Sequence, residues 1–207
     1  CTKLLTWVSV MQLVEQGKID LNRDVQAYLP PAFFKNLKYG EPITMLNLMN
    51  HNAGWQETVT DLFIKDKKDI KNLGDELQYL EPEQIYKPGE IVAYSNWGAA
   101  LAGYIVECVS GQSFSDYVKE HIFTPLDMEH TAISPDLSDN KWVLDKRQKE
   151  KCYTPNNKSL DTSLYYIALY PAGMATGTLS DFVKFARAFD PAAGSTSPLF
   201  QNAGTLD

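Results

Sequence analysis

Three side chains of this sequence have the chemistry needed to move a proton within one site: Lys3, Tyr94 and Asn96. Lys3 begins a strongly apolar segment, and Tyr94-Ser95-Asn96 follows a Pro88-Gly89-Glu90 turn much later in the chain. Burial and the positive end of a helix both favour the neutral amine of a lysine, which is the form that accepts a proton. We expect the three side chains to converge in one concave site, because only a shared active site requires all three residue types together.

Each of these residues also has a purely structural interpretation. A lysine close to the start of a helix is commonly an ordinary solvated residue. Ser95 or Asn96 has the side chain of a helix cap, which explains their presence without any chemistry. The choice between the two interpretations depends on whether the rest of the chain agrees with a catalytic site.

Two strongly apolar helices must position the three residues. The residues from Lys3 to Gln16 are apolar around most of a helical wheel, so this helix must be buried on nearly every side. A second apolar helix begins at Ser95 or Asn96 and closes at Gly111. Further helices are predicted at 44–49, 75–80, 113–122 and 178–189, with Thr44 and a Thr178-x-x-Asp181 box as N-terminal caps.

Strand-like alternation is nearly absent from the sequence, and there is no internal repeat. Residues 134–163 are polar and are predicted to form loops. Beyond Asp190 the content of Gly, Ser, Pro and Ala predicts a poorly ordered tail. As given, the chain is therefore expected to be mainly α.

The composition describes a soluble chain of 207 residues with 44% apolar residues and a formal net charge of −7. A net negative charge argues against a nucleic-acid partner, because phosphate binding needs a clustered basic face. One run of lysines, between Lys65 and Lys71, is interleaved with Asp66 and Asp69 and is predicted to be a solvated surface. No apolar run reaches the roughly 18 residues needed to span a bilayer.

Cysteine and histidine usage predicts neither a disulfide framework nor a metal site. The cysteines are odd in number, and their spacings include no CxxC pair. The histidines lack the short spacings of metal-binding motifs. These residues are Cys1, Cys108 and Cys152, and His51, His121 and His130.

Lys3 and Tyr94-x-Asn96 resemble the Ser-x-x-Lys and Tyr-x-Asn motifs of the serine β-lactamase and penicillin-binding protein superfamily. In that register the serine nucleophile belongs directly before Cys1. The resemblance covers about residues 1–189 and is closest to the class C β-lactamase, D,D-peptidase and esterase branch. Further stretches that match in order and spacing are 10–21, 43–54, 87–93, 122–128 and 171–186.

The resemblance implies the helical region of an α+β fold from which most of the antiparallel sheet is missing. Residues 1–189 would form the β-lactamase-like helical region and part of the core domain, and residues 190–207 the tail. It also implies a protein of the cell envelope, or a secreted one.

The chemistry implied by the resemblance is acyl transfer through a serine, with no metal or organic cofactor. Lys3 matches the lysine that activates the serine, and Tyr94 matches the residue that relays a proton to the leaving group. Asn96 matches the side chain that orients the substrate carbonyl or the lysine. The substrate stays open between a β-lactam, a D-Ala peptide and a small ester. His51, Asn52 and Trp55 are assigned to packing and loop structure.

Two departures from the family pattern lead us to expect an inactive fragment. The serine is absent from the sequence, and no Lys-Thr-Gly or His-x-Gly element follows Gly173. The alternative function is a non-catalytic sensor or binding module that uses the same fold to hold peptidoglycan or penicillin. Lys3 together with Tyr94 and Asn96 favours catalysis, since a binding module needs no proton relay.

Burial of the Lys3–Gln16 helix raises a further expectation. This chain supplies helices for one side of it, whereas the family's sheet would cover the other. Several residues, such as Leu4, Leu5, Val8 and Met11, would then be left in water. We expect the open side to be covered by a second copy through self-association, by strands within residues 140–175, or by other chain segments.

Overall fold

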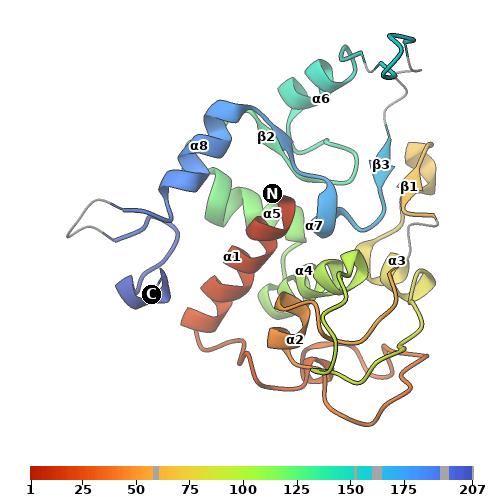
Figure 1. The fold of residues 1–207 in the computed structure, drawn as a ribbon. Helices are drawn as coiled ribbons and strands as arrows, with labels where there is room; N and C mark the ends of the chain where they lie inside the picture. Colours follow the sequence, from red (N-terminus) through yellow and green to blue (C-terminus); the bar gives the residue numbers. More distant parts are fainter. Residues whose placement is uncertain (58–60, 152, 160–164, 192–195, 207) are drawn as a thin grey trace.

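The computed structural model describes residues 1–57, 61–151, 153–159, 165–191 and 196–206. Its centre is a junction of three helices: α1 (Thr2–Glu15), α4 (Asn96–Ser110) and α7 (Tyr170–Gly173). Each of the three packs against the other two, as Figure 1 shows for α1 in red, α4 in green and α7 in blue. The N-terminal ends of α1 and α4 therefore lie near α7, although the three helices come from distant parts of the chain.

The apolar surface of α1 is buried on most of its sides but not on all. Leu5 and Val8 are 4% and 3% exposed, whereas Leu4 is 44% exposed. Trp7, Met11 and Val14 are half-buried, so the uncovered side is one stripe along the helix. Leu5 and Val8 are thus buried within this chain, where α4, α5 and α7 pack against α1. Self-association through this helix stays a prediction.

The helix α4 begins and ends with the caps that its sequence predicts. The Ser95 hydroxyl oxygen accepts a hydrogen bond from the Gly98 N–H at 2.9 Å, and Gly111 ends the helix in the left-handed conformation. Within α4, Gly103 allows α7 to approach closely, because a Cβ there would lie 2.4 Å from the Pro171 Cβ. A glycine at this position thus lets α7 lie directly on α4.

The other predicted helices are present with small shifts of their ends. Thr44 caps α2 through a complete capping box with Asn47, and Thr178 caps α8. One helix, α6, lies inside the stretch predicted as loop, where the Asn140 side chain accepts the N–H groups of Trp142 and Val143. No helix in the described ranges is long and apolar enough to cross a bilayer. Besides α1, α4 and α7, the helices and helical turns of the described residues are η1 (Val25–Tyr28), α2 (Met45–Met49), η2 (Lys67–Asp69), α3 (Leu73–Tyr79), α5 (Phe114–Val118), η3 (Lys119–Phe123), α6 (Lys141–Arg147), α8 (Leu179–Arg187) and η4 (Ala203–Leu206).

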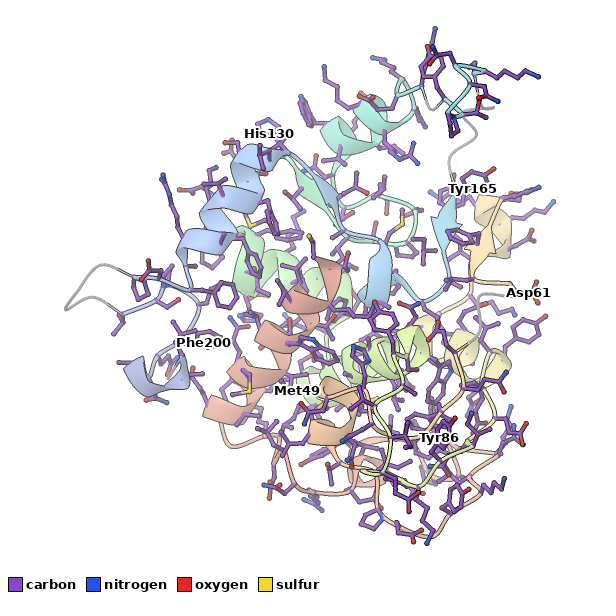
Figure 2. The ribbon with its side chains drawn as sticks, viewed as in Figure 1. Met49, Asp61, Tyr86, His130, Tyr165 and Phe200 are labelled. Atoms are coloured by element: carbon purple, nitrogen blue, oxygen red, sulfur yellow. The ribbon has the colours of Figure 1, made fainter. Side chains whose placement is uncertain are left out.

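The strands of the described residues form two small antiparallel ribbons. β1 (Phe63–Ile64) pairs with β3 (Tyr166–Ile167), and β2 (Thr131–Ala132) pairs with β4 (Thr176–Gly177). Asp61 and Tyr165, labelled in Figure 2, mark the side of the molecule on which β1 and β3 lie. Strands of two residues are too short to show alternation, so they could not be predicted from hydrophobic periodicity.

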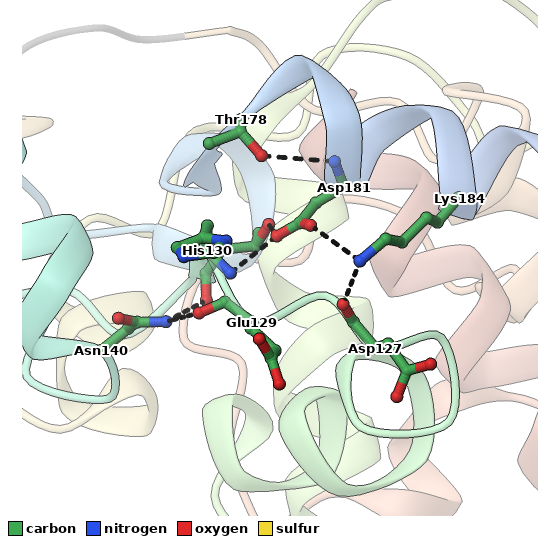
Figure 3. A network of polar contacts seen from close by, with 8 residues as sticks. Asp127, Glu129, His130, Asn140, Thr178, Asp181 and Lys184 are labelled. Carbon is green, nitrogen blue, oxygen red and sulfur yellow. Dashed lines mark hydrogen bonds and ion pairs between the residues drawn. The ribbon is translucent and has the colours of Figure 1, made fainter.

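A buried carboxylate joins the ribbon of β2 and β4 to α8 (Figure 3). Asp181 is 1% exposed, and it accepts hydrogen bonds from the His130 N–H at 2.7 Å and from the Thr131 hydroxyl at 2.9 Å. The Thr178 hydroxyl caps the Asp181 N–H, which is half of the predicted capping box. The Asp181 carboxylate binds β2 instead of completing that box, and Lys184 lies 3.4 Å from it. The network fixes the ribbon that precedes α8.

Residues 196–206 of the predicted tail make specific contacts with α1. The Glu15 carboxylate accepts the N–H groups of Gln201 and Asn202 at 3.0 Å each, and the Gln12 side chain donates to the Leu199 carbonyl at 2.9 Å. Phe200, labelled in Figure 2, belongs to the same segment and is 7% exposed. The composition of the tail did not indicate these contacts.

The close approach of α4 and α7 predicts the effect of Gly103→Ala. The added methyl group would overlap Pro171, so the variant should lose about 1–3 kcal/mol of unfolding free energy. Gly173→Ala is the matched control, because the nearest atom to its Cβ, on Ile167, is 3.7 Å away. Urea denaturation of both variants measures the difference, and equal midpoints would contradict the packing described here.

Candidate active site

Lys3, in the first turn of α1, has partners on both of the other central helices. Its Nζ donates to the Asn96 Oδ1 at 2.6 Å and to the Ala172 carbonyl at 3.0 Å. The same Nζ lies 4.6 Å from the centroid of the Tyr94 ring. The structure therefore brings Lys3, Tyr94 and Asn96 together, and it adds a backbone carbonyl from α7 that sequence reasoning missed.

Tyr94 lies on the loop that leads into α4, and His51 holds this loop on both sides of it. The His51 carbonyl accepts the Ala93 N–H at 2.7 Å, and its Nδ1 accepts the Ser95 N–H at 3.2 Å. The two rings also pack together, with 4.5 Å between the centroids of His51 and Tyr94. Tyr94 itself is 55% exposed, so the site is open to solvent on that side rather than closed around the three residues.

Asn96, the first residue of α4, is held by a carboxylate that sequence reasoning did not single out. Its N–H donates to Glu57 Oε2 at 2.6 Å, and its Nδ2 donates to Glu57 Oε1 at 2.9 Å. Glu57 and Asn96 are both half-buried. Nothing in the residues around Glu57 indicates this contact, since it joins positions that are 39 residues apart.

The loop between His51 and Glu57 is fixed by its own packing. Trp55 is buried against Trp97, with 4.6 Å between ring centroids, and the Asn52 side chain accepts the Asn47 amide at 3.0 Å. Gly54 has a φ of +93°, and a Cβ there would lie 2.0 Å from the carbonyl oxygen of Tyr86 (labelled in Figure 2). Only glycine fits this close approach between residues 51–57 and the loop that contains Tyr86.

The charges of the site act on His51. Burial lowers the pKa of His51, and the positive charge of Lys3 lowers it further, whereas the carboxylate of Glu57 raises it. The lowered pKa favours the neutral imidazole. That form is the one the geometry requires, because Nδ1 must be unprotonated to accept the Ser95 N–H.

An apolar cavity of about 260 Å³ lies beside the N-terminal end of α1. Its lining includes Cys1, which precedes α1, Leu5 of α1, and Phe182 and Phe185 of α8. The described residues contain no group of three or more His, Cys, Asp or Glu side chains placed to hold a metal ion. The Lys3 amine and the Tyr94 phenol lie together next to a helix N-terminus, and such groups can transfer protons.

Comparison with known families and proteins finds matches over most of the chain. The beta-lactamase family model matches residues 1–205. Protein flp of Staphylococcus aureus strain MW2 is 30% identical over 137 residues, covering 63% of this chain and 26% of that protein. The putative penicillin-binding protein PbpX of Bacillus subtilis strain 168 is 27% identical over 188 residues, covering 90% of this chain and 44% of that protein. The chain thus spans less than half the length of these relatives.

Solved structures share the fold. The D-amino acid amidase of Ochrobactrum anthropi SV3, complexed with D-phenylalanine, is 22% identical and aligns with a TM-score of 0.74. That alignment covers 92% of this chain and 55% of the amidase. FmtA of Staphylococcus aureus is 26% identical with a TM-score of 0.69, over 91% of this chain and 50% of FmtA. The fold expected from the sequence is confirmed at the level of the beta-lactamase and penicillin-binding protein fold.

The contact between His51 and the Ser95 N–H predicts a pH dependence of stability. The pKa of His51 is lower in the folded protein than in the unfolded chain, so the unfolded chain binds more protons as the pH falls. The stabilisation from His51 should be fully present above pH 6.5 and should be lost as the pH falls through the folded-state pKa.

His51→Asn tests this dependence, because asparagine does not titrate and tolerates the φ of +53° found at this position. The difference in unfolding free energy between the unmodified protein and the variant is measured at pH 7.5 and at pH 5. The advantage of the unmodified protein should shrink at the lower pH. A difference that stays constant would show that His51 does not act as the neutral acceptor.

Proposed function

This chain belongs to the beta-lactamase family, and we propose that its parent protein is a serine hydrolase that works through an acyl-enzyme intermediate. The observation that supports this most directly is the 2.6 Å contact between the Lys3 Nζ and the Asn96 Oδ1, beside the Tyr94 ring. A lysine, a phenol and an amide in one place are the groups that activation of a serine and protonation of a leaving group require.

The motif register places the serine directly before Cys1, at i−3 from Lys3. Residues three apart on a helix share a face, so the hydroxyl and the amine would be neighbours. The serine would also stand at the N-terminus of α1, where the helix dipole stabilises a developing alkoxide. Two acceptors, Asn96 Oδ1 and the Ala172 carbonyl, receive two N–H bonds of Lys3. In the neutral amine this leaves the lone pair free to point toward the serine hydroxyl.

In the proposed reaction the Lys3 amine takes the hydroxyl proton while the serine oxygen attacks the carbonyl carbon of the substrate. The tetrahedral intermediate collapses to the acyl-enzyme as Tyr94 gives its phenolic proton to the leaving group, and the Lys3 ammonium returns a proton to the Tyr94 phenolate. Water then attacks the acyl-enzyme, one of its protons returns to the serine oxygen, and the acid is released. Tyr94 is 55% exposed, so its phenol is accessible to the leaving group of a substrate that binds from solvent.

The substrates we propose are β-lactams, D-Ala peptides or small esters, in keeping with the class C β-lactamase, D,D-peptidase and esterase branch. Each offers a carbonyl with a nitrogen or oxygen leaving group. The names of the similar proteins, a penicillin-binding protein and a D-amino acid amidase, support a carbonyl substrate of this kind. On the same resemblance we propose a cell-envelope or secreted location.

The alternative is a binding or sensor module with the same fold. The residue directly before Cys1 in the parent protein separates the two functions, because the hydrolase needs serine at that position. The register puts the nucleophile outside residues 1–207, so we expect a polypeptide of these residues alone to show neither labelling by a fluorescent penicillin nor turnover of an ester. Labelling of the chain by itself would contradict the assigned register.

Tyr94→Phe in the parent protein tests the proton relay. The kcat for a p-nitrophenyl ester should fall by about 10²- to 10⁴-fold with little change in KM, since the relay acts mainly in the transition state. Tyr79→Phe, which changes an exposed tyrosine of α3 in the same way, is the control and should leave kcat unaltered. A Tyr94→Phe enzyme with an unchanged kcat would remove Tyr94 from the mechanism.

A further inference from the structure

Glu57 makes a two-point contact with Asn96. One carboxylate oxygen accepts the backbone N–H, and the other accepts the side-chain Nδ2. The N–H belongs to the first residue of α4, so it is one of the groups that a helix leaves without an internal partner. A negative charge at this end of a helix is also favoured by the helix dipole.

The contact decides which way the Asn96 amide faces. An asparagine side chain has one accepting end and one donating end, whereas a carboxylate can only accept. The NH₂ group of Asn96 must therefore turn toward Glu57, and the Oδ1 is left to accept from Lys3 at 2.6 Å. The hydrogen bonds to Glu57 and to Lys3 thus require the same orientation of the Asn96 amide.

We infer that Glu57 is a positioning residue that holds the Asn96 amide oxygen toward Lys3, an inference that rests on the function proposed above. Without this carboxylate the amide is free to turn and to present its NH₂ group to Lys3. The Lys3 Nζ would then lose one of its two acceptors and with it the alignment of its lone pair. Both carboxylate oxygens of Glu57 accept hydrogen bonds from Asn96, so Glu57 acts through that residue.

Glu57→Gln in the parent protein is the first test. The introduced amide keeps the shape of the side chain, but its NH₂ end must face either the Asn96 N–H or the Asn96 Nδ2. The NH₂ group of the introduced glutamine would then face an N–H donor of Asn96, unless the Asn96 amide turns over and directs its own NH₂ group at Lys3. We expect kcat for a p-nitrophenyl ester to fall by about 10- to 100-fold with KM nearly unchanged, the loss of one hydrogen bond to a charged group. Glu83→Gln, an exposed carboxylate on the neighbouring segment, is the charge-matched control.

Asn96→Asp provides the rescue. Alone, it sets two carboxylates against each other, so kcat should also fall. Combined with Glu57→Gln, it restores the pairing, because the introduced glutamine donates to one oxygen of the introduced carboxylate while the other oxygen accepts from Lys3. The double variant should recover the unfolding midpoint that each single variant loses, whereas its kcat should stay low, because a carboxylate beside Lys3 favours the ammonium over the neutral amine. A double variant whose midpoint is no better than those of the singles, or a Glu57→Gln enzyme with full kcat, would overturn the inference.

The same four proteins give a readout that does not depend on activity. Urea unfolding of the unmodified protein, the two single variants and the double variant forms a double-mutant cycle. We expect each single substitution to lower the unfolding midpoint and the double variant to recover part of the loss. Additive losses would show that Glu57 does not set the Asn96 amide. If the unmodified parent protein is not labelled by a fluorescent penicillin and does not hydrolyse a p-nitrophenyl ester, the proposed hydrolase function fails. The double-mutant cycle would still show whether Glu57 and Asn96 interact.

Discussion

One amine group with two oxygen acceptors, at the place where three helices meet, is the constraint on which the structure depends. Lys3 on α1 donates to Asn96 on α4 and to the Ala172 carbonyl on α7. For both contacts to form, α7 must lie directly on α4, which Gly103 permits, and α1 must be buried along most of its length. The core packing and the geometry of the site are thus two aspects of a single arrangement.

Sequence reasoning identified the side chains of the site whose types carry chemistry, but not the groups that hold them. Lys3, Tyr94 and Asn96 stand in short motifs at helix starts, and such motifs can be read from the chain. The Ala172 carbonyl has no sequence signature, because every residue carries one. Glu57 is a common residue type in an unremarkable context, and its contact with Asn96 spans 39 positions. Pairings of this kind are set by tertiary structure.

Some elements of the fold could likewise be predicted from the sequence, and others could not. The helix at 3–16 and the helix that begins at Asn96 were predictable, because their apolar residues and their caps act locally. The ribbon formed by β2 and β4 was not, because its two-residue strands are held partly by Asp181 from a helix that follows them. The helix α6 was missed because its sequence is polar, and its start depends on the single side chain of Asn140.

The segment from His51 to Glu57 has a consequence for how substitutions affect the site. At one end of this segment, His51 accepts hydrogen bonds from the backbone on both sides of Tyr94, and at the other end Glu57 accepts hydrogen bonds from Asn96. Gly54, in the middle of the segment, packs closely against the Tyr86 carbonyl. The Tyr94 loop and the Asn96 amide are therefore both held by this one segment, so a substitution within residues 51–57 would displace both groups relative to Lys3.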